Sequence, residues 1–282
     1  MNRCKNISGI ESTMRHRDSI PASDGVDRMR LGILSDIHGN RHALEAVLIE
    51  LEARGIDRLI CLGDVVGYGP EPEACLDLLL QLNSVMILGN HEEAVLRPEI
   101  ASGFRDAARE AIAWTRRRLR RDRPDLMEYL ASLPGMAYLG AAVMCVHDSP
   151  APSGARYLVT GRDAVDAFAG VDVPVCLVGH THLPTAFRYI EPGPGEDVGR
   201  IHVEARGSLR RIQVDASQRW IINPGSVGQP RDGDPRASYA TLDLADGVIE
   251  WERVAYDISA AQRHAIEAGL PVRSAERLAV GA

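Results

Sequence analysis

Lysine is almost absent from this sequence of 282 residues, since Lys5 is the only lysine among 32 basic side chains. Such a complete preference for arginine reflects genome composition rather than an adaptation to phosphate binding. The formal net charge is −7, so the overall balance attracts neither nucleic acid nor an anionic membrane. Long apolar runs are also lacking, and none approaches the ~18–20 residues that span a bilayer. We therefore expect no membrane association and disfavour a nucleic-acid partner.

Cysteine is scarce and shows no paired spacing. The five cysteines are odd in number, and none forms a CxxC motif. Three of them lie in apolar, strand-like runs, where a free cysteine behaves as a small buried hydrophobic residue. This pattern argues against a disulfide framework and fits a reducing compartment. The N-terminus lacks the apolar region of a secretory signal, so we predict a cytoplasmic protein.

The chain divides into a polar start and one long folded part. Residues 1–28 show no apolar periodicity, and we expect them to form a disordered extension. From Met29 onward, short apolar strands alternate with helices, which predicts βαβ units with parallel strands. The expected strands are 31–34, 58–64, 84–92, 141–148 and 173–182, and the expected helices are 43–55, 71–82, a helical stretch over 104–133, and 163–169. The tail is β-rich over 208–256 and ends in a helix over 259–269. Its strands have no core of their own, so we expect a single domain over 29–282.

Apolar segments in this sequence end repeatedly in a histidine, a carboxylate or a carboxamide. This happens at DIHGN, GD, GNHE, VHD and GHTH, each of which follows an apolar run. In a mostly parallel sheet the carboxyl ends of the strands share one edge, where ligands bind. We therefore expect one cluster of eight side chains: Asp36, His38, Asp64, Asn90, His91, His147, His180 and His182.

The chemistry of this set indicates a site for two metal ions. Asp-x-His or Gly-Asp alone often has only a structural role, but packing does not explain five such motifs in order at strand ends. Two carboxylates, one carboxamide and four imidazoles suit manganese, iron, zinc or nickel. Seven ligands are too many for one tetrahedral ion and fit two divalent ions that share a carboxylate. Ions ~3.5–4 Å apart can activate water and bind a phosphate together. The predicted ligands are Asp36, His38, Asp64, Asn90, His147, His180 and His182.

The series DIHGN, GDVVGYG, GNHE, VHD and GHTH resembles the calcineurin-like metallophosphoesterase superfamily. Together with the trailing NPGSVGQPRDG, it is most similar to the small prokaryotic phosphodiesterase-like group. The resemblance extends from Met29 to Asp257. It implies an α/β fold, a four-layer α/β/β/α sandwich of two mixed β-sheets, with the metal site at the carboxyl edge of the strands. These motifs are specific for the fold and the metal centre and much less specific for the substrate.

The resemblance also implies a role for each residue. Asp36, His38 and His182 would hold one ion, Asn90, His147 and His180 the other, and Asp64 would bridge them. His91 would donate a proton to the leaving group, a role that general acid–base chemistry also requires. The implied activity is hydrolysis of a small phosphate mono- or diester by metal-activated hydroxide, and a nucleotide is one candidate substrate.

Two positions depart from the family's pattern. In its protein phosphatases, the segment after GD carries an aspartate that orients the catalytic histidine and an arginine that grips phosphate. Here GDVVGYG has Gly67 and Tyr68 instead, which disfavours a phosphoprotein phosphatase. Asp148 replaces the usual glycine after His147, and the sequence leaves open whether it binds the second ion or caps a turn.

Arg231 and Tyr68 are candidate substrate contacts. Arg231 follows a Gly/Pro turn, and a guanidinium can bind phosphate through two hydrogen bonds; an ordinary surface arginine is the alternative. The run Arg116–Arg121 could bind polyanions, but its acidic neighbours favour a solvated helix face.

Two other functions stay open besides hydrolysis of a small phosphoester. One is a phosphoprotein phosphatase, and the other is a metal-binding scaffold of the same fold that has lost catalysis. The presence of His91 and of all seven predicted ligands argues against the scaffold. The sequence leaves a homo-oligomer open.

Overall fold

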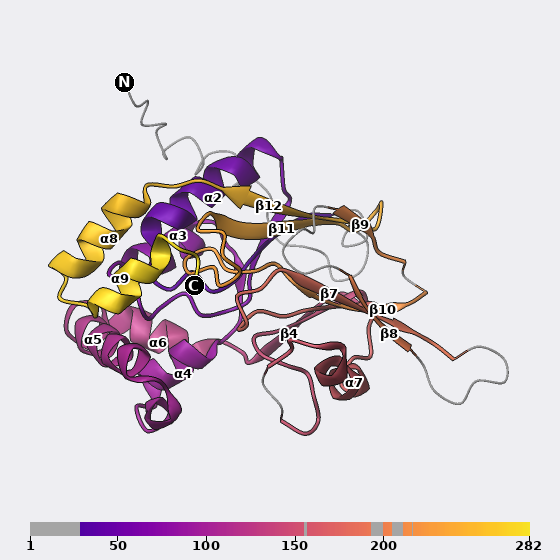
Figure 1. Ribbon diagram of the computed structural model, residues 1–282, viewed down its shortest axis with the longest axis horizontal. Coiled ribbons are helices and arrows are strands. Elements are labelled where there is room, and N and C mark those ends of the chain that lie inside the picture. The colour runs from indigo at the N-terminus through magenta and orange to yellow at the C-terminus, as the bar shows by residue number, and fades with distance from the viewer. Residues whose placement is uncertain (1–28, 155–156, 193–199, 205–210, 216) are drawn as a thin grey trace.

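A computed structural model describes residues 29–154, 157–192, 200–204, 211–215 and 217–282, and its strands form two six-stranded sheets (Figure 1). The expected extension over 1–28 and the expected loop near Gly193 lie outside the described residues. Each sheet mixes parallel and antiparallel pairs, as the family resemblance implied.

The first sheet joins the start of the chain to its tail. Its parallel half comes from β1 (Arg30–Leu34), β2 (Arg58–Cys61) and β3 (Val85–Met86), with α2 (Arg41–Ala53) and α3 (Pro72–Gln81) between them. Its antiparallel half is β11 (Ala237–Asp243), β12 (Val248–Val254) and β9 (Arg211–Gln213). Since β11 pairs directly with β1, the tail strands complete a sheet that the first residues begin.

The second sheet has a parallel centre and antiparallel edges. The centre is β5 (Val143–Val146), β6 (Val175–Leu177) and β10 (Arg219–Asn223). The edges are β4 (Met136–Leu139) on one side and β7 (Thr185–Ile190) followed by β8 (Arg200–Glu204) on the other. The sequence did not predict β4, β7 or β8, and apart from β1 the strands that it did predict are shorter in the structure.

The two sheets pack face to face and are covered by helices outside. Leu31 and Ile33 of β1 share one buried cluster with Val143 and Leu177 of the second sheet. Leu34 points to the opposite face, where it belongs to a cluster with the buried side of α2 and α3. The outer face of the second sheet packs on α7 (Gly161–Ala169). This alternation of strand faces produces the expected four layers.

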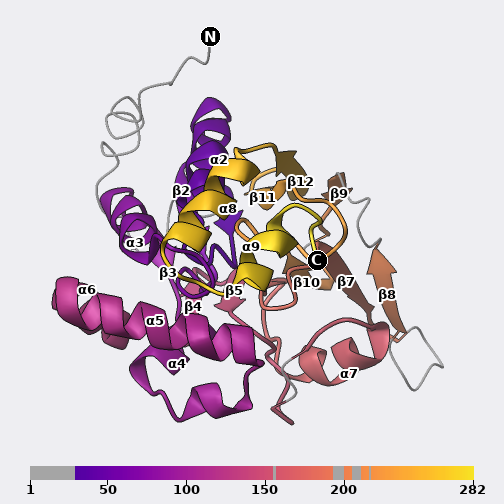
Figure 2. The same ribbon diagram turned by 60° about the vertical axis from the view of Figure 1, so that its left-hand side comes forward.

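The remaining helices lie beside the carboxyl edge of the first sheet. They are α4 (Asn90–Leu96), a 3₁₀ turn (Ile100–Gly103), α5 (Asp106–Asp122), α6 (Pro124–Ser132), α8 (Ile258–Glu267) and α9 (Val272–Leu278). Proline at 124 separates α5 from α6, because the residue before proline avoids the helical conformation. Figure 2 shows α8 lying across α2, and both α8 and α9 pack beside α5. None of the described helices is long and apolar enough to span a bilayer.

The arginine run lies on α5 as a helix face. Leu119 within it is fully buried. Arg116 donates to the carbonyl oxygen of Leu96 at 2.8 Å, and Arg118 Nε lies 2.5 Å from Glu73 Oε1. The run therefore fixes α5 against its neighbours.

Candidate metal centre

The loops that follow the central strands meet at one edge of the molecule. Asp36 N donates to Gly63 O at 3.1 Å and His38 N to Asp64 O at 2.9 Å, so the loops after β1 and β2 are hydrogen-bonded together. The loop after β6 joins that after β5 through Gly179 N and His147 O at 2.8 Å. Backbone hydrogen bonds thus hold together the loops that carry the predicted ligands.

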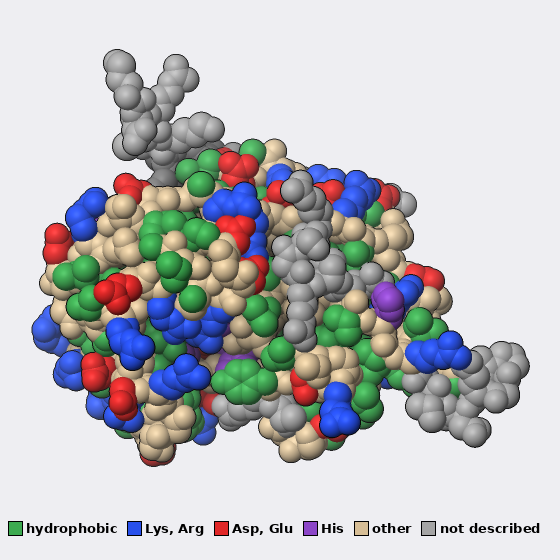
Figure 3. Space-filling model, in the orientation of Figure 1, with side chains coloured by type: hydrophobic (Ala, Val, Ile, Leu, Met, Phe, Trp, Pro, Cys, Tyr) green, Lys and Arg blue, Asp and Glu red, His purple; other side chains and the backbone are tan. Residues whose placement is uncertain are grey.

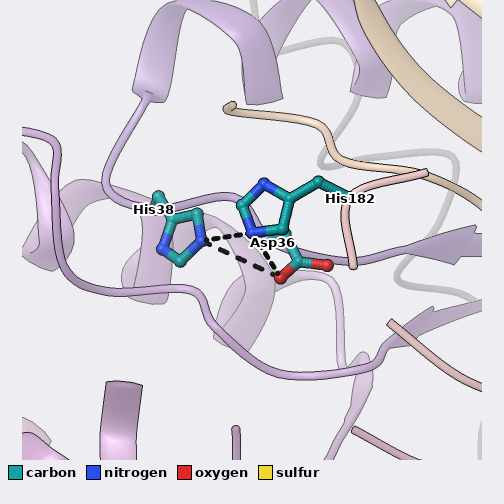
Figure 4. A group of neighbouring side chains, drawn as sticks. All are labelled: Asp36, His38 and His182. Carbon is teal, nitrogen blue, oxygen red and sulfur yellow. Dashed lines mark hydrogen bonds and ion pairs between the residues drawn. The ribbon is translucent and has the colours of Figure 1, made fainter. Parts of the chain in front are cut away.

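The first group of ligand atoms comes from Asp36, His38 and His182, which point toward one another (Figure 4). His182 Nε2 lies 3.2 Å from both Asp36 Oδ1 and His38 Nε2. His38 Nε2 lies 3.8 Å from Asp36 Oδ1. Atoms that share an ion at ~2.1 Å lie about this far apart.

The second group comes from Asp64, Asn90, His147 and His180. Asn90 Oδ1 lies 2.8 Å from His180 Nδ1 and 3.0 Å from His147 Nε2. Asp64 Oδ2 lies 3.3 Å from His147 Nε2 and also 3.8 Å from His38 Nε2 in the first group. Asp64 is therefore the carboxylate that faces both groups. All seven side chains are buried.

Hydrogen bonds on the far side of these groups aim them at the cluster. His38 and His147 direct Nδ1 at the carbonyl oxygens of Val66 and Leu62, at 3.0 Å and 2.7 Å. His182 does the same toward Gln229 O at 2.5 Å. A carbonyl oxygen only accepts, so each Nδ1 carries a hydrogen, and in the neutral ring each Nε2 then has a free lone pair for a metal.

The two carboxylates are oriented in a similar way. Asp36 Oδ2 accepts a hydrogen bond from His180 N at 3.1 Å, and Asp64 Oδ1 accepts one from His91 N at 2.8 Å. The opposite oxygen of each, Asp36 Oδ1 and Asp64 Oδ2, is left to face the imidazoles. Asp36 Oδ1 and His180 Nε2 are buried without a hydrogen-bond partner among the described residues.

The backbone at this edge is strained. Seven described residues other than glycine have a left-handed φ, and six of them belong to or touch the cluster: Asp36, His38, Asp64, Tyr68, His180 and His182. Each such conformation costs about 1–3 kcal/mol and persists only where the surrounding structure enforces it. These loops therefore adopt backbone conformations that are unfavourable in themselves but that bring the side chains to the cluster.

The electrostatics favour metal ligation at most positions. Burial alone would raise the pKa of Asp64, but the neighbouring His147 and His91 outweigh it and hold that pKa well below its usual range. Burial lowers the pKa of His180 to about 4 and also depresses that of His38, which keeps both rings neutral. Burial would likewise lower the pKa of His147, but Asp64 raises it to about 10. His147 must therefore release a proton when a cation binds.

These donors fit divalent transition metals. Imidazole nitrogens with free lone pairs, ionised carboxylates and an amide oxygen converge on two adjacent points, with one carboxylate common to both. Imidazole suits zinc, iron, nickel and copper, while carboxylate and carbonyl oxygens suit manganese. The residues present thus form buried histidine and aspartate clusters consistent with a dinuclear centre.

His91 lies at the edge of the cluster, where one of its ring nitrogens forms a further group of potential metal ligands with His38 and Asp64. Its Nε2 is 4.0 Å from Asp64 Oδ2, and its ring contacts the rings of His38, Tyr68 and Phe104 at centroid distances of 4.6, 4.9 and 5.3 Å. A Cβ at Gly67 would lie 2.2 Å from His91 Nδ1, so glycine there makes room for this ring. Nδ1 is buried and has no hydrogen-bond partner among the described residues. No aspartate orients the ring through that atom, as the departure at Gly67 led us to expect.

Glu92 is a buried residue that the sequence reasoning missed. Its carboxylate accepts hydrogen bonds from the backbone N–H groups of Asp64, Val66 and Gly89 at 2.8, 3.0 and 2.9 Å. Burial and the charge of Asp64 raise its pKa to about 7. Glu92 thereby holds the loop after β2 against the loop after β3. The sequence signal for this residue was its place in the GNHE motif, directly after His91.

A cavity of about 760 Å³ opens beside the cluster. Both candidate substrate contacts line it, and Arg231 Nη2 donates to Gln229 Oε1 at 3.1 Å. Arg105 and Arg277 line it as well, and the sequence reasoning singled out neither. Asp148 Oδ1 accepts the N–H of Ser149 at 2.9 Å, and Asp148 belongs to none of the potential metal-ligand groups among the described residues.

Comparison with known proteins agrees with this geometry. The profile of the calcineurin-like phosphoesterase superfamily domain matches residues 29–247. An uncharacterized protein of Methanocaldococcus jannaschii is 34% identical over 252 residues, which cover 89% of this chain and 98% of that protein. The crystal structure of a metallophosphoesterase from Sphaerobacter thermophilus is 39% identical, covers 90% of this chain and 99% of its own, and has a TM-score of 0.74. A hypothetical protein from Pyrococcus horikoshii, 19% identical with a TM-score of 0.69 over 90% of this chain and 98% of its own, shares the fold.

Proposed function

Because the chain belongs to the calcineurin-like phosphoesterase superfamily, we propose that it hydrolyses a small phosphate mono- or diester at a two-metal centre. The observation that carries this proposal is the pair of buried ligand groups that share Asp64. Asp36, His38 and His182 would hold one ion, and Asn90, His147 and His180 the other. Two such ions supply stabilisation of phosphoryl charge and activation of water.

The residues around the ions complete the site. Tyr68 and Arg231 line the same cavity as the ligands, and the guanidinium suits the oxygens of a phosphoryl group. His91 faces this cavity from the edge of the cluster and can donate its Nε2 hydrogen toward the leaving oxygen. Burial of the ligands excludes bulk water, which strengthens these interactions.

Two alternatives are less well supported. A phosphoprotein phosphatase would need a group that orients His91, and Nδ1 of His91 has no such partner among the described residues. A metal-binding scaffold would not need His91 beside an open cavity. We therefore favour an enzyme that acts on small phosphoesters, and a nucleotide is one substrate that the cavity volume of about 760 Å³ accommodates.

Metal analysis combined with a phosphoester assay tests the proposal. The purified protein should carry close to two transition-metal ions and should hydrolyse bis-p-nitrophenyl phosphate or p-nitrophenyl phosphate. Asp64→Asn should lose both ions and the activity, whereas His182→Ala should mainly empty one site. No bound metal together with no activity after addition of manganese would disprove the function. Retention of two ions and normal turnover in Asp64→Asn would disprove the shared ligand.

A further inference from the structure

Three arginines line the cavity. Arg105, Arg231 and Arg277 all contribute to its wall, and the only acidic side chain there is Asp64, which faces the histidines. In the described part of the chain, no aspartate or glutamate forms an ion pair with any of the three. Figure 3 shows basic side chains gathered around a small histidine surface near the middle of the molecule. The cavity is thus locally basic in a protein whose net charge is −7.

Arg277 is held in this position at an electrostatic cost. It lies on α9, and its Nε donates to the main-chain oxygen of Ala282, while its two terminal nitrogens make no hydrogen bond with the described residues. Burial and the nearby Arg231 lower the pKa of Arg277, and Arg105 acts in the same direction. Like charges held together in a partly buried wall repel each other, and a bound anion relieves that repulsion.

Arg231 occupies a different place from the other two. Its Nε is buried without a partner, and it also interacts with Tyr68, which contacts His38 and His91. Arg231 is thus the arginine tied to the metal cluster and suits the phosphoryl group that reacts there. Arg105, at the start of α5, and Arg277, on α9, make no ring contact with the cluster histidines and remain available for another anion.

The cavity also has room for a substrate longer than one phosphate. Its volume of about 760 Å³ lies in the range of pockets that enclose whole organic ligands. Phe104 and Tyr157 form part of the wall. Their rings lie at a tilt beside those of His91 and His180, at centroid distances of 5.3 and 4.5 Å. An organic group can therefore lie between the cluster and the distal arginines.

The helix that carries Arg277 is fixed to the rest of the molecule. Trp114 Nε1 of α5 donates to Ala268 O at 3.0 Å, and Gln262 of α8 donates to Ala275 O of α9 at 3.0 Å. Gly233 N donates to Gly281 O at 2.9 Å, which ties the segment after α9 to the loop that carries Arg231. The α8–α9 pair lies beyond residues 29–247, which the family profile matches. This pair of helices places the charge of Arg277 at the site.

We infer that Arg105 and Arg277 bind a second phosphate group of the substrate, so that the preferred substrate is a phosphoester carrying a further phosphate. This inference rests on the proposed function, because it assumes that the reacting phosphoryl group lies at the metal cluster. The second phosphate would be the feature by which the enzyme selects among phosphoesters.

A matched pair of chromogenic substrates tests the inference. Thymidine 5′-(p-nitrophenyl phosphate) and its 3′-phosphorylated derivative share the scissile bond and the leaving group and differ only in the second phosphate. The wild-type protein should prefer the phosphorylated compound by roughly tenfold in kcat/KM, as expected for added charge-assisted hydrogen bonds. Arg277→Gln should remove most of that preference. Arg273→Gln removes an exposed charge from the same helix outside the cavity wall, and should change the preference by less than about twofold.

Binding of phosphonates gives a second readout that does not depend on turnover. Calorimetry of the protein as purified should show tighter binding of 3′-phosphorylated thymidine 5′-methylphosphonate than of thymidine 5′-methylphosphonate, and Arg277→Gln should reduce that difference roughly tenfold. Equal kcat/KM for the two nucleotide esters in the wild type, or a preference unchanged by Arg277→Gln, would overturn the inference. If neither ester were hydrolysed with any metal, the proposed function would fail, and the phosphonate difference would still decide whether the second anion site exists.

Discussion

At the scale of single residues, His91 separates catalysis from metal binding. It neighbours the predicted ligand Asn90, yet its ring turns toward Tyr68 and Phe104 and the cavity. We predict that His91→Ala keeps its metal ions and its fold but turns over ~10²–10⁴-fold more slowly, because it lacks a positioned proton donor. Metal content and kcat for an alkyl ester and a p-nitrophenyl ester of the same phosphate would measure this.

The leaving group decides which role His91 has. Proton donation predicts a smaller deficit for p-nitrophenolate, which needs little protonation. Burial lowers the pKa of His91 to about 4. A ring that stays neutral in the complex would stabilise the leaving oxygen by a hydrogen bond and would not transfer a proton to it. Equal slowing of both esters would therefore assign it to transition-state binding instead. His202→Ala, an exposed histidine on β8, is the matched control, and loss of metal in His91→Ala alone would make His91 a ligand.

At the scale of structural elements, Glu92 connects α4 to the loops after β2 and β3. Its Oε2 accepts from Asp64 N and Gly89 N, and its Oε1 accepts from Val66 N. In Glu92→Gln one of these oxygens becomes an amide NH₂ that faces an N–H donor. We therefore predict a loss of about 1–3 kcal/mol in the free energy of unfolding, measured by urea denaturation.

The adjacent residue supplies the control for Glu92. Glu93→Gln makes the same chemical change but removes only an ion pair with Arg97 at 2.8 Å on the helix surface. Such a pair contributes about 0.3–0.5 kcal/mol. Equal stability of the two variants would show that Glu92 does not hold the loops.

At the scale of the whole molecule, the folded part is expected to begin at Met29. β1 pairs with β2 and β11 through residues from Arg30 onward, and Leu244 N donates to Met29 O at 3.0 Å. A chain that starts at Met29 should therefore keep the Tm and the kcat/KM of the full chain. Thermal unfolding and the bis-p-nitrophenyl phosphate assay would check this. A large loss of Tm or of kcat/KM would mean that residues 1–28 pack on the folded part. The predicted single domain over 29–282 would then have to be extended toward the N-terminus.

The sequence by itself indicated which side chains gather at the site, and the family resemblance that its motifs carry implied the layers. A short apolar run that ends in His, Asp or Asn predicts a buried strand followed by a polar loop. This prediction needs only a few consecutive residues. That signal placed eight polar side chains at one edge, and the structure brings all eight together. It also predicted α2, α3, α7 and α8 to within a few residues.

Only the tertiary structure decided how the cavity around these ligands is built. The Gly/Pro turn before Arg231 marked that residue in the sequence, but nothing in the neighbouring residues of Arg105 and Arg277 distinguishes these two from other arginines. The same holds for Glu92, whose partners lie on two loops, and for β7 and β8, which pair at the edge of the second sheet. The physical reason is that these roles depend on contacts between distant segments, which packing creates and which no local periodicity encodes.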